Sequence, residues 1–205
     1  MKPTEPLQTL ADWMEEARQR GTAEPEAMAL ATVSSSGAPS VRVVLCRGID
    51  ERGLRFFTNY ESRKGLELGQ NGLAAVVFHW PVLGRQVRVE GMTERLSAAE
   101  SDAYFAARPR GHRISAWASP QSRPVTSLDE IRRRAAQLEI DHAGREVPRP
   151  RHWGGYLLRP TAVELWAQGA DRLHDRMRFE RSEVASGAAD ADLAQSPWMA
   201  RQLAP

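Results

Sequence analysis

Residues 73–95, LAAVVFHWPVLGRQVRVEGMTER, contain two consecutive segments with the composition of β-strands. The first segment runs from Leu73 to Trp80, and the second runs from Arg85 to Arg95. In the second, Val87 and Val89 alternate with polar side chains, and this period of two is typical of a strand that buries one face. Because the two segments follow one another closely, they predict a pair of neighbouring antiparallel strands.

Segments of similar character occur on both sides of this pair. We expect further strands at Val41 to Arg47, Leu54 to Thr58, Tyr156 to Leu158, Ala162 to Trp166 and Leu173 to Phe179, and Ala27 to Val33 is a run of small apolar residues. Apolar spacing and end signals predict four helices, at Leu7 to Ala17, Ser62 to Gln70, Ser97 to about Arg108 and Ser127 to Leu138. The last two begin with capping boxes, in which a serine precedes a glutamate by three residues.

Strands in consecutive pairs with helices inserted between them predict a mainly β, α+β fold. The expected architecture is an antiparallel barrel with helical excursions rather than a doubly wound sheet. No Gly-x-Gly-x-x-Gly follows a strand and there is no P-loop, so a nucleotide-like ligand would be held by side chains and strand backbone. We expect one domain over 1–205, with a helix within 1–24 and a mobile hairpin loop at 182–197.

Composition narrows the class of protein. The 205 residues are enough to bury a core, and no apolar run approaches the length that spans a bilayer. The first ten residues lack the charged and apolar regions of a signal peptide, and the single cysteine, Cys46, fits a reducing compartment. We therefore expect a cytoplasmic protein. A net charge of +2 and an aromatic content of 7% do not favour a nucleic-acid-binding module.

Arginine greatly outnumbers lysine in this chain. Of the 28 basic residues, only Lys2 and Lys64 are lysines, which leaves 26 arginines. A bias of this size indicates genome composition, so most of the arginines carry no functional message. Lys64 stands out because lysine was kept there although arginine was the default.

The polar residues do not form a metal site or a nucleophilic triad. The five histidines show no HExxH or other paired spacing, and one cysteine cannot build a thiolate site. No Gly-x-Ser-x-Gly is present. The residues that remain as candidate ligand contacts are basic, amide and aromatic side chains.

One candidate is a helix start rich in positive charge. Ser62 is placed to cap a helix that opens with Arg63 and Lys64, where free backbone N–H groups and cations converge, and this favours a phosphate site. The alternative is an exposed basic first turn. Tyr104 and Arg108 lie four residues apart on one helix face and are suited to clamp an anion; the alternative is a surface aromatic–arginine pair. Other candidates are Arg42, Thr58, Gln86, Gln121 and Ser122.

The stretch Arg172-Leu173-His174-Asp175-Arg176 is expected to lie in a strand. Alternation then places Arg172, His174 and Arg176 on one face, about 7 Å apart in successive pairs. Two guanidinium groups beside an imidazole repel one another unless something anionic lies across them, and arginine suits both phosphate and flat rings. The alternative is a solvated strand face with three cations.

These clusters occur in the order and spacing of a known family. From about Pro25 to Pro205 the chain resembles the pyridoxine (pyridoxamine) 5'-phosphate oxidases, FMN enzymes with a split β-barrel fold. The resemblance rests on motifs distributed along the chain: Arg42-Val-Val-Leu, Phe57-Thr-Asn, Ser62-Arg-Lys64, Arg85-Gln-Val, Tyr104-Phe-x-x-Arg-Pro-Arg110, Ala116-Trp-x-Ser-x-Gln-Ser122, Trp153-Gly-Gly, Arg172-Leu-His-Asp-Arg176 and Arg201-x-Leu-Ala-Pro205.

The resemblance implies a cofactor site and a substrate site. The FMN phosphate would be held by Arg42, Arg63, Lys64 and Ser122. The flavin would be lined by Val43, Val44, Leu45, Phe57, Thr58, Gln86 and Gln121, and would be reached from the second subunit of a homodimer by Trp166 and Arg176. The substrate phosphate would contact Arg47, Tyr104, Arg108 and His112, and its ring would be covered by Arg172, Leu173 and His174.

The implied reaction is hydride transfer from C4' of pyridoxine or pyridoxamine 5'-phosphate to flavin N5, which yields pyridoxal 5'-phosphate. Dioxygen then reoxidises the flavin and is reduced to hydrogen peroxide. Arg172 and His174 are the candidates for stabilising charge on the ring while C4' is held over N5.

The chain departs from the family pattern mainly in the substrate half. Arg47 stands where the family usually has lysine, His112 stands where it usually has serine, and an N-terminal lid with an arginine and a tyrosine is expected to be absent. Trp166-Ala-Gln also replaces the usual Trp-Gln-Gly. Two alternatives stay open: a related FMN oxidase acting on another flat acidic ring such as a phenazine precursor, and a non-catalytic carrier of FMN or pyridoxal phosphate. A carrier would not need Arg172 and His174.

Overall fold

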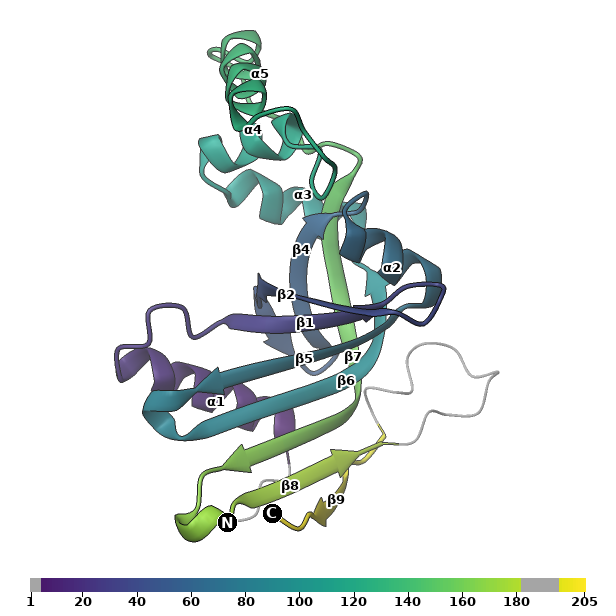
Figure 1. The fold of residues 1–205 in the computed structure, drawn as a ribbon. Helices are drawn as coiled ribbons and strands as arrows, with labels where there is room; N and C mark the ends of the chain where they lie inside the picture. The colour runs from purple at the N-terminus through teal and green to yellow at the C-terminus, as the bar shows by residue number, and fades with distance from the viewer. Residues whose placement is uncertain (1–4, 182–195) are drawn as a thin grey trace.

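The computed structural model describes residues 5–181 and 196–205 (Figure 1). In this part of the chain nine strands form one antiparallel sheet in the order β2-β1-β5-β6-β7-β4-β3, with β8 paired to β7 and β9 paired to β8. The sheet curls so that β2 approaches β4. The predicted mainly β fold with inserted helices is therefore confirmed. The strands are β1 Ala27–Val33, β2 Pro39–Leu45, β3 Gly48–Asp50, β4 Gly53–Asn59, β5 Leu73–Trp80, β6 Arg85–Arg95, β7 Trp153–Ala167, β8 Asp175–Glu180 and β9 Met199–Gln202.

The helices begin where the sequence carries start signals. Ser62 Oγ accepts a hydrogen bond from the Gly65 N–H at 3.3 Å, and Ser97 and Glu100 form a complete capping box. Ser127 caps the last helix in the same way as Ser62. The described helices are α1 Pro6–Gln19, α2 Arg63–Asn71, α3 Ala98–Ala107, α4 Arg110–Ala118 and α5 Leu128–Asp141, with two short 3-10 turns, η1 Pro81–Leu83 and η2 Ala170–Arg172.

The strand pair from which the sequence argument started is confirmed to the residue as β5 and β6. The two late strands predicted at Tyr156 to Leu158 and Ala162 to Trp166 are wrong as separate elements, because both belong to the 15-residue strand β7. β7 continues through Pro160, and its pairing with β6 shifts register next to Gly91. Such a bulge interrupts the hydrogen-bond ladder locally, which lets a strand contain a proline.

The strand predicted at Leu173 to Phe179 begins only at Asp175. In the preceding turn η2, Asp171 and Arg172 have φ angles of 52° and 65°. A left-handed backbone cannot continue a pleated strand. The prediction that Arg172 shares a strand face with His174 and Arg176 is therefore wrong. Arg172 and His174 belong to the hairpin between β7 and β8, and only Arg176 lies in the strand.

Some short elements of the structure were not predicted, and one predicted loop lies largely outside the described residues. α4, β3 and β9 were not predicted, since they are short or follow a proline-rich junction. The hairpin loop predicted at 182–197 lies outside the described residues, apart from its last two positions.

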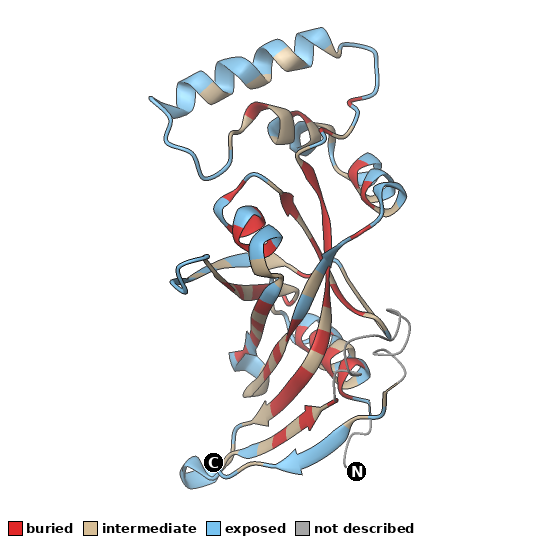
Figure 2. Ribbon diagram, turned by 90° about the vertical axis from the view of Figure 1, so that its right-hand side faces the viewer, coloured by how far each residue is buried: buried red, intermediate tan, exposed pale blue. Residues whose placement is uncertain are grey.

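The core lies between the inner face of the curled sheet and α1. This helix buries Leu7, Leu10, Met14 and Ala17, which recur at helical spacing. Figure 2 shows the buried residues along the central strands, whereas α5 has none. Among the described residues, no helix is long and apolar enough to cross a membrane.

Candidate active site

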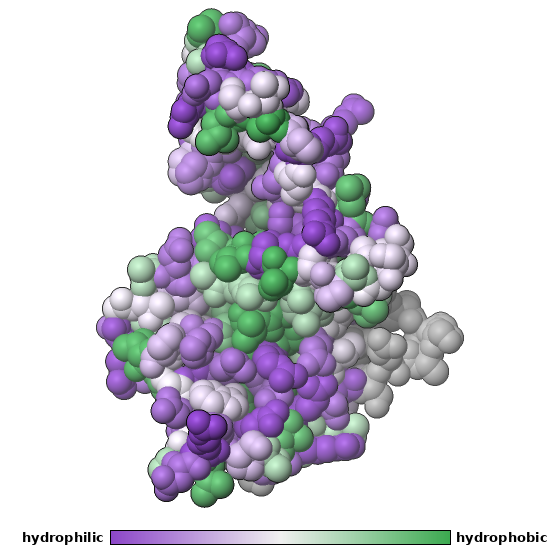
Figure 3. Space-filling view, viewed as in Figure 1, coloured by the Kyte–Doolittle hydropathy of each residue, from purple (hydrophilic) through white to green (hydrophobic). Residues whose placement is uncertain are grey.

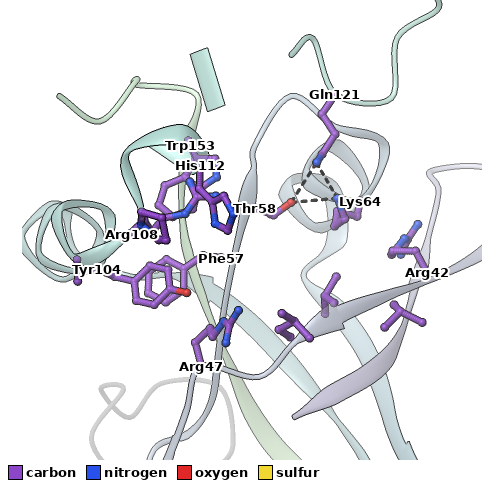
Figure 4. A pocket seen from close by; sticks show the side chains of 15 residues that line it. Arg42, Arg47, Phe57, Thr58, Lys64, Tyr104, Arg108, His112, Gln121 and Trp153 are labelled. Atoms are coloured by element: carbon purple, nitrogen blue, oxygen red, sulfur yellow. Dashed lines mark hydrogen bonds between the residues drawn. The ribbon is translucent and has the colours of Figure 1, made fainter. Parts of the chain in front are cut away.

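A cavity of about 660 Å³ opens between β2, β4 and the helices α2, α3 and α4 (Figure 4). Its size falls in the range of small-molecule sites. Four of its side chains are lysine or arginine, and no described residue that lines it is Asp or Glu. The cavity therefore favours an anionic ligand. Its lining consists of Arg42, Val43, Val44, Leu45, Arg47, Phe57, Thr58, Lys64, Tyr104, Ala107, Arg108, Pro109, His112, Gln121 and Trp153.

Lys64 occupies one end of the cavity, in the first turn of α2. Its Nζ donates hydrogen bonds to Gln121 Oε1 at 2.8 Å and Thr58 Oγ1 at 3.0 Å (Figure 4). It also donates to Ser62 Oγ at 3.3 Å. Burial, together with the nearby charge of Arg42, lowers the pKa of Lys64 to about 8. The three oxygen partners are uncharged, so they satisfy its hydrogen bonds without neutralising it. An anion at this end would be stabilised by the remaining charge.

Arg42 is held in place by a buried carboxylate that the sequence argument missed. Arg42 Nη2 lies 3.3 Å from Glu67 Oε2, and Nη1 donates to Thr32 Oγ1 at 2.5 Å. Burial of Glu67 raises the pKa of its carboxyl, but hydrogen bonds from Ser40, Thr32 and Arg63 outweigh this effect and lower it to about 2. The carboxylate therefore remains ionised and fixes the arginine that borders the cavity.

The strand β2 presents an open edge to the cavity. It is the terminal strand of the sheet and pairs with β1 alone among the described strands, so its outer backbone N–H and C=O groups have no strand partner. Val41 and Val43 on this strand are 70% and 68% exposed. Figure 3 shows an apolar area on this face of the molecule, at the level of β1 and β2. An open strand edge beside apolar side chains suits the edge of a flat heterocycle.

The opposite wall is aromatic. Phe57 stacks on Tyr104 with ring centroids 3.8 Å apart, and on Trp153 at 5.6 Å. The guanidinium of Arg108 lies 4.5 Å from the centre of Trp153, and its buried Nη1 has no hydrogen-bond partner in the described part of the chain. Burial lowers the pKa of Arg108; Tyr104 opposes this effect and Arg47 adds to it. An unsatisfied buried donor is costly, so a bound anion here would relieve that cost.

Arg47 and His112, two positions where the chain departs from the pattern of the family it resembles, also line the cavity. Arg47 Nη1 lies 3.5 Å from Glu26 Oε1, and Arg47 remains about one-third exposed at 36%. His112 projects from α4 between Arg108 and Gln121 in the lining (Figure 4). Both positions therefore place basic side chains in the same lining as Arg108.

A second group of predicted residues lies in a row across β6, β7 and β8. Gln86 pairs in register with Trp166, and Trp166 pairs with Arg176. Directly paired residues in antiparallel strands point to the same face, so these three side chains share one side of the sheet. Arg176 donates through Nε to Glu164 Oε1 at 3.0 Å, and Glu164 is another buried carboxylate that the sequence argument missed.

The hairpin after β7 brings two further candidates to this row. The ring of His174 lies 4.6 Å from that of Trp166. His174 Nδ1 accepts a hydrogen bond from the Gly169 N–H at 3.3 Å, which leaves Nε2 for a ligand. Arg172 and Leu173 are exposed in the same hairpin.

The cavity and the row lie at opposite ends of β7 (Figure 1). Trp153 lines the cavity and Trp166 belongs to the row, a separation of 166 − 153 = 13 residues. Thirteen residues of strand correspond to about 43 Å of chain. One small ligand cannot contact both groups of the same copy, although a second copy can bring its row to the first copy's cavity.

The predicted site residues thus fall into two sets, with two positions outside both. Arg63 is largely exposed and pairs with Glu67, and Ser122 is exposed with φ of 69°; neither lines the cavity. Trp153 lines the cavity but had no predicted role. Its signal was the Trp-Gly-Gly motif, whereas Glu67 was signalled only by its position four residues after Arg63 on a predicted helix.

Comparison with known proteins gives the family. Residues 14–140 match the family model described as pyridoxamine 5'-phosphate oxidase. The chain belongs to that family. Residues 153–205 also match the model of the pyridoxine 5'-phosphate oxidase C-terminal dimerisation region, which contains the whole of β7, β8 and β9.

Relatives named pyridoxine/pyridoxamine 5'-phosphate oxidase are similar over most of their length. The one from Salinibacter ruber is 47% identical over 202 residues, which cover 98% of this chain and 89% of the relative. The one from Cupriavidus necator is 53% identical over 175 residues, which cover 85% and 82% respectively.

Solved structures share the fold. PhzG from Burkholderia lata 383, in complex with tetrahydrophenazine-1-carboxylic acid, has a TM-score of 0.88 and 35% identity, covering 100% of this chain and 94% of that one. A pyridoxamine 5'-phosphate oxidase-related, FMN-binding protein from Nostoc punctiforme has a TM-score of 0.74 at 17% identity, covering 99% and 100%. The second likeness supports the split-barrel fold alone.

The residues of the cavity fit FMN. Its phosphate requires cationic donors, which Lys64 and Arg42 supply. The described hydrogen-bond partners of Lys64 are uncharged, whereas Arg42 is paired with Glu67. Its ring requires hydrogen-bonding groups along one edge, which the open side of β2 and the amide of Gln121 supply. The unsatisfied Nη1 of Arg108 lies in the other half of the cavity, so a second anionic group has its own place.

Proposed function

We propose that this chain is an FMN-dependent oxidase that converts pyridoxine or pyridoxamine 5'-phosphate into pyridoxal 5'-phosphate. The observation that carries the proposal is the cavity with two separate cationic ends in a member of this family. Lys64 and Arg42 form one end and Arg108 and Arg47 the other, which suits two phosphate-bearing molecules side by side. The single cysteine, Cys46, supports a reducing compartment and hence the cytoplasm.

The complete site is proposed to need two copies of the chain. Trp166 near the end of β7, Arg172 and His174 in the following hairpin, and Arg176 in β8 lie too far from the start of β7 to reach their own cavity. All four fall within the region matched as a dimerisation region. The exposed valines of β2 provide apolar surface beside the cavity for a second copy. In this homodimer each cavity receives the row of the other copy, with FMN at the interface.

The chain's own residues position the substrate. The substrate phosphate is held by Arg108 and Tyr104, with Arg47 and His112. Phe57, which stacks on Tyr104, belongs to the aromatic wall of the same cavity. Arg172 and His174 of the second copy cover the pyridine ring, where His174 Nε2 is available for a hydrogen bond to the substrate. Bound FMN supplies the hydride acceptor, and dioxygen is the final oxidant, so that each alcohol oxidised yields one hydrogen peroxide. The amine substrate also consumes one water and releases ammonia.

A second candidate function is oxidation of a flat ring carrying a carboxylate. It is favoured by the similarity to PhzG, at 35% identity over the whole chain. Arg108 would then bind a carboxylate in place of a phosphate.

The visible spectrum of the FMN-loaded protein separates these functions. We expect anaerobic addition of pyridoxine 5'-phosphate to bleach the flavin, and admission of air to restore its colour. Bleaching by tetrahydrophenazine-1-carboxylic acid but not by pyridoxine 5'-phosphate would support the second candidate. A flavin that stays oxidised with both compounds would contradict the oxidase and support a carrier.

A further inference from the structure

Arg176 is held from two sides by groups that have no assigned role. Glu164 Oε1 accepts from Arg176 Nε at 3.0 Å and lies 2.9 Å from its Nη2. On the other side, Arg176 Nη1 donates to the carbonyl oxygen of Ala204 at 2.9 Å. The backbone is tied as well, because the Leu203 N–H donates to the carbonyl of Arg176 at 2.9 Å.

Glu164 is well suited to hold an arginine in one orientation. Its side chain is 3% exposed, so water does not compete with the carboxylate as the partner of Arg176. Its second oxygen lies 3.5 Å from Arg88 Nη1, which anchors the carboxylate from the neighbouring strand. A planar guanidinium loses its rotational freedom when two of its nitrogens contact the same carboxylate.

The contacts leave part of Arg176 available. They use three of the five N–H donors of the guanidinium, one on each of its three nitrogens. The side chain is still 26% exposed, on the face that also carries Trp166 and Gln86. The guanidinium is therefore fixed on two sides and keeps one N–H on each of Nη1 and Nη2 for a further partner.

We infer that Glu164 and the segment 203–204 are positioning residues that fix Arg176 for the flavin bound by the second copy. This inference rests on the proposed function, in which Arg176 contacts FMN. It gives the Leu-Ala-Pro motif at 203–205 a role in cofactor binding that sequence position alone does not suggest. Fixing the side chain beforehand removes the entropy cost of ordering it on binding.

The test measures FMN affinity without turnover. FMN is titrated with flavin-free protein and its fluorescence quenching gives the dissociation constant. We expect Glu164→Gln, and separately deletion of 203–205, to weaken FMN binding about tenfold, since each loosens a charge-assisted contact. The deletion removes only residues outside the buried core, so it keeps the test valid if Glu164→Gln fails to fold.

Two matched controls lie in the same elements. Glu180→Gln removes a carboxylate of β8 that pairs with Arg178, without touching Arg176, Glu164 or Arg88. Gln202→Ala removes the bond to Asp175 Oδ1 between β8 and β9. Both controls should bind FMN like the unmodified protein, and light scattering should show an unchanged dimer in all variants.

Repeating the titrations in an Arg176→Ala background separates positioning from general stability. If Glu164 and 203–205 act through Arg176, the same changes have no further effect in that background. An equal loss in both backgrounds, or no loss in either, would overturn the inference. If Arg176→Ala itself leaves FMN binding unchanged, the proposed flavin contact of Arg176 fails and the inference fails with it; flavin bleaching by substrate would still test the oxidase.

Discussion

Raising the pH should weaken FMN binding because Lys64 loses its proton. The pKa of this ammonium is lowered to about 8 by burial and by the charge of Arg42, whereas an ordinary lysine stays charged to beyond pH 10. The protonated fraction in the flavin-free protein therefore falls from about nine-tenths at pH 7 to about one-tenth at pH 9. If the phosphate is bound through the charged form, the dissociation constant rises about tenfold over this range.

The assay is the fluorescence titration at a series of pH values and constant ionic strength. Lys64→Arg is the matched variant, because a guanidinium remains charged throughout this range. We expect its dissociation constant to be nearly constant with pH, whatever its absolute value. Riboflavin, which lacks the phosphate, serves as the ligand control. A flat profile for the unmodified protein, or an unchanged tenfold rise in Lys64→Arg, would refute the placement of the phosphate at Lys64.

Three further predictions concern the remaining parts of the site. Arg172→Ala and His174→Ala should each lower kcat at least tenfold while FMN remains bound, as steady-state kinetics and the flavin spectrum will show; normal turnover in both would remove their proposed role. Arg47→Lys should keep turnover, with KM for the phosphorylated substrate changed less than tenfold, whereas complete loss would mean that the pocket requires arginine. Glu67→Gln should lower the free energy of unfolding by about 3 kcal/mol in denaturant titrations, because it leaves Arg42 without its buried partner. The pKa of Glu67 is lowered to about 2, so the stability it provides is present above pH 4.5 and is lost as the pH falls through 2.

The local parts of the fold were predictable because their signals are local. The period-two valines place one face of β6 in the core, and the caps at Ser62 and Ser97 fix where α2 and α3 begin. The extent of β7 was not predictable in this way, since a proline ordinarily ends a central strand and only pairing with β6 carries it past Pro160.

The turn before β8 shows a similar limit. Arg172 adopts a left-handed backbone that its residue type does not favour, so alternation from Arg172 to Arg176 predicted a shared face that does not exist. The hairpin nevertheless brings His174 against Trp166, because β7 and β8 pair directly. Contacts of this kind are set by tertiary pairing rather than by sequence spacing.

The candidate site shows the same difference between residues that the sequence indicates and contacts that only the fold creates. Motif residues that line the cavity, such as Lys64 and Arg108, could be named from the sequence. Their buried partners could not, since Glu67 and Glu164 are ordinary surface residues until the fold encloses them. The division of the site between two ends of β7 also required the structure.

Activity in mixed dimers tests most directly whether one site is assembled from two copies. One partner carries Arg108→Ala in the cavity, and the other carries Arg172→Ala with His174→Ala in the hairpin, so that each homodimer is inactive. In an equal co-refolded mixture, half of the dimers are mixed and each has one intact site, so we predict about a quarter of the unmodified activity. A mixture no more active than its two components would contradict the shared site.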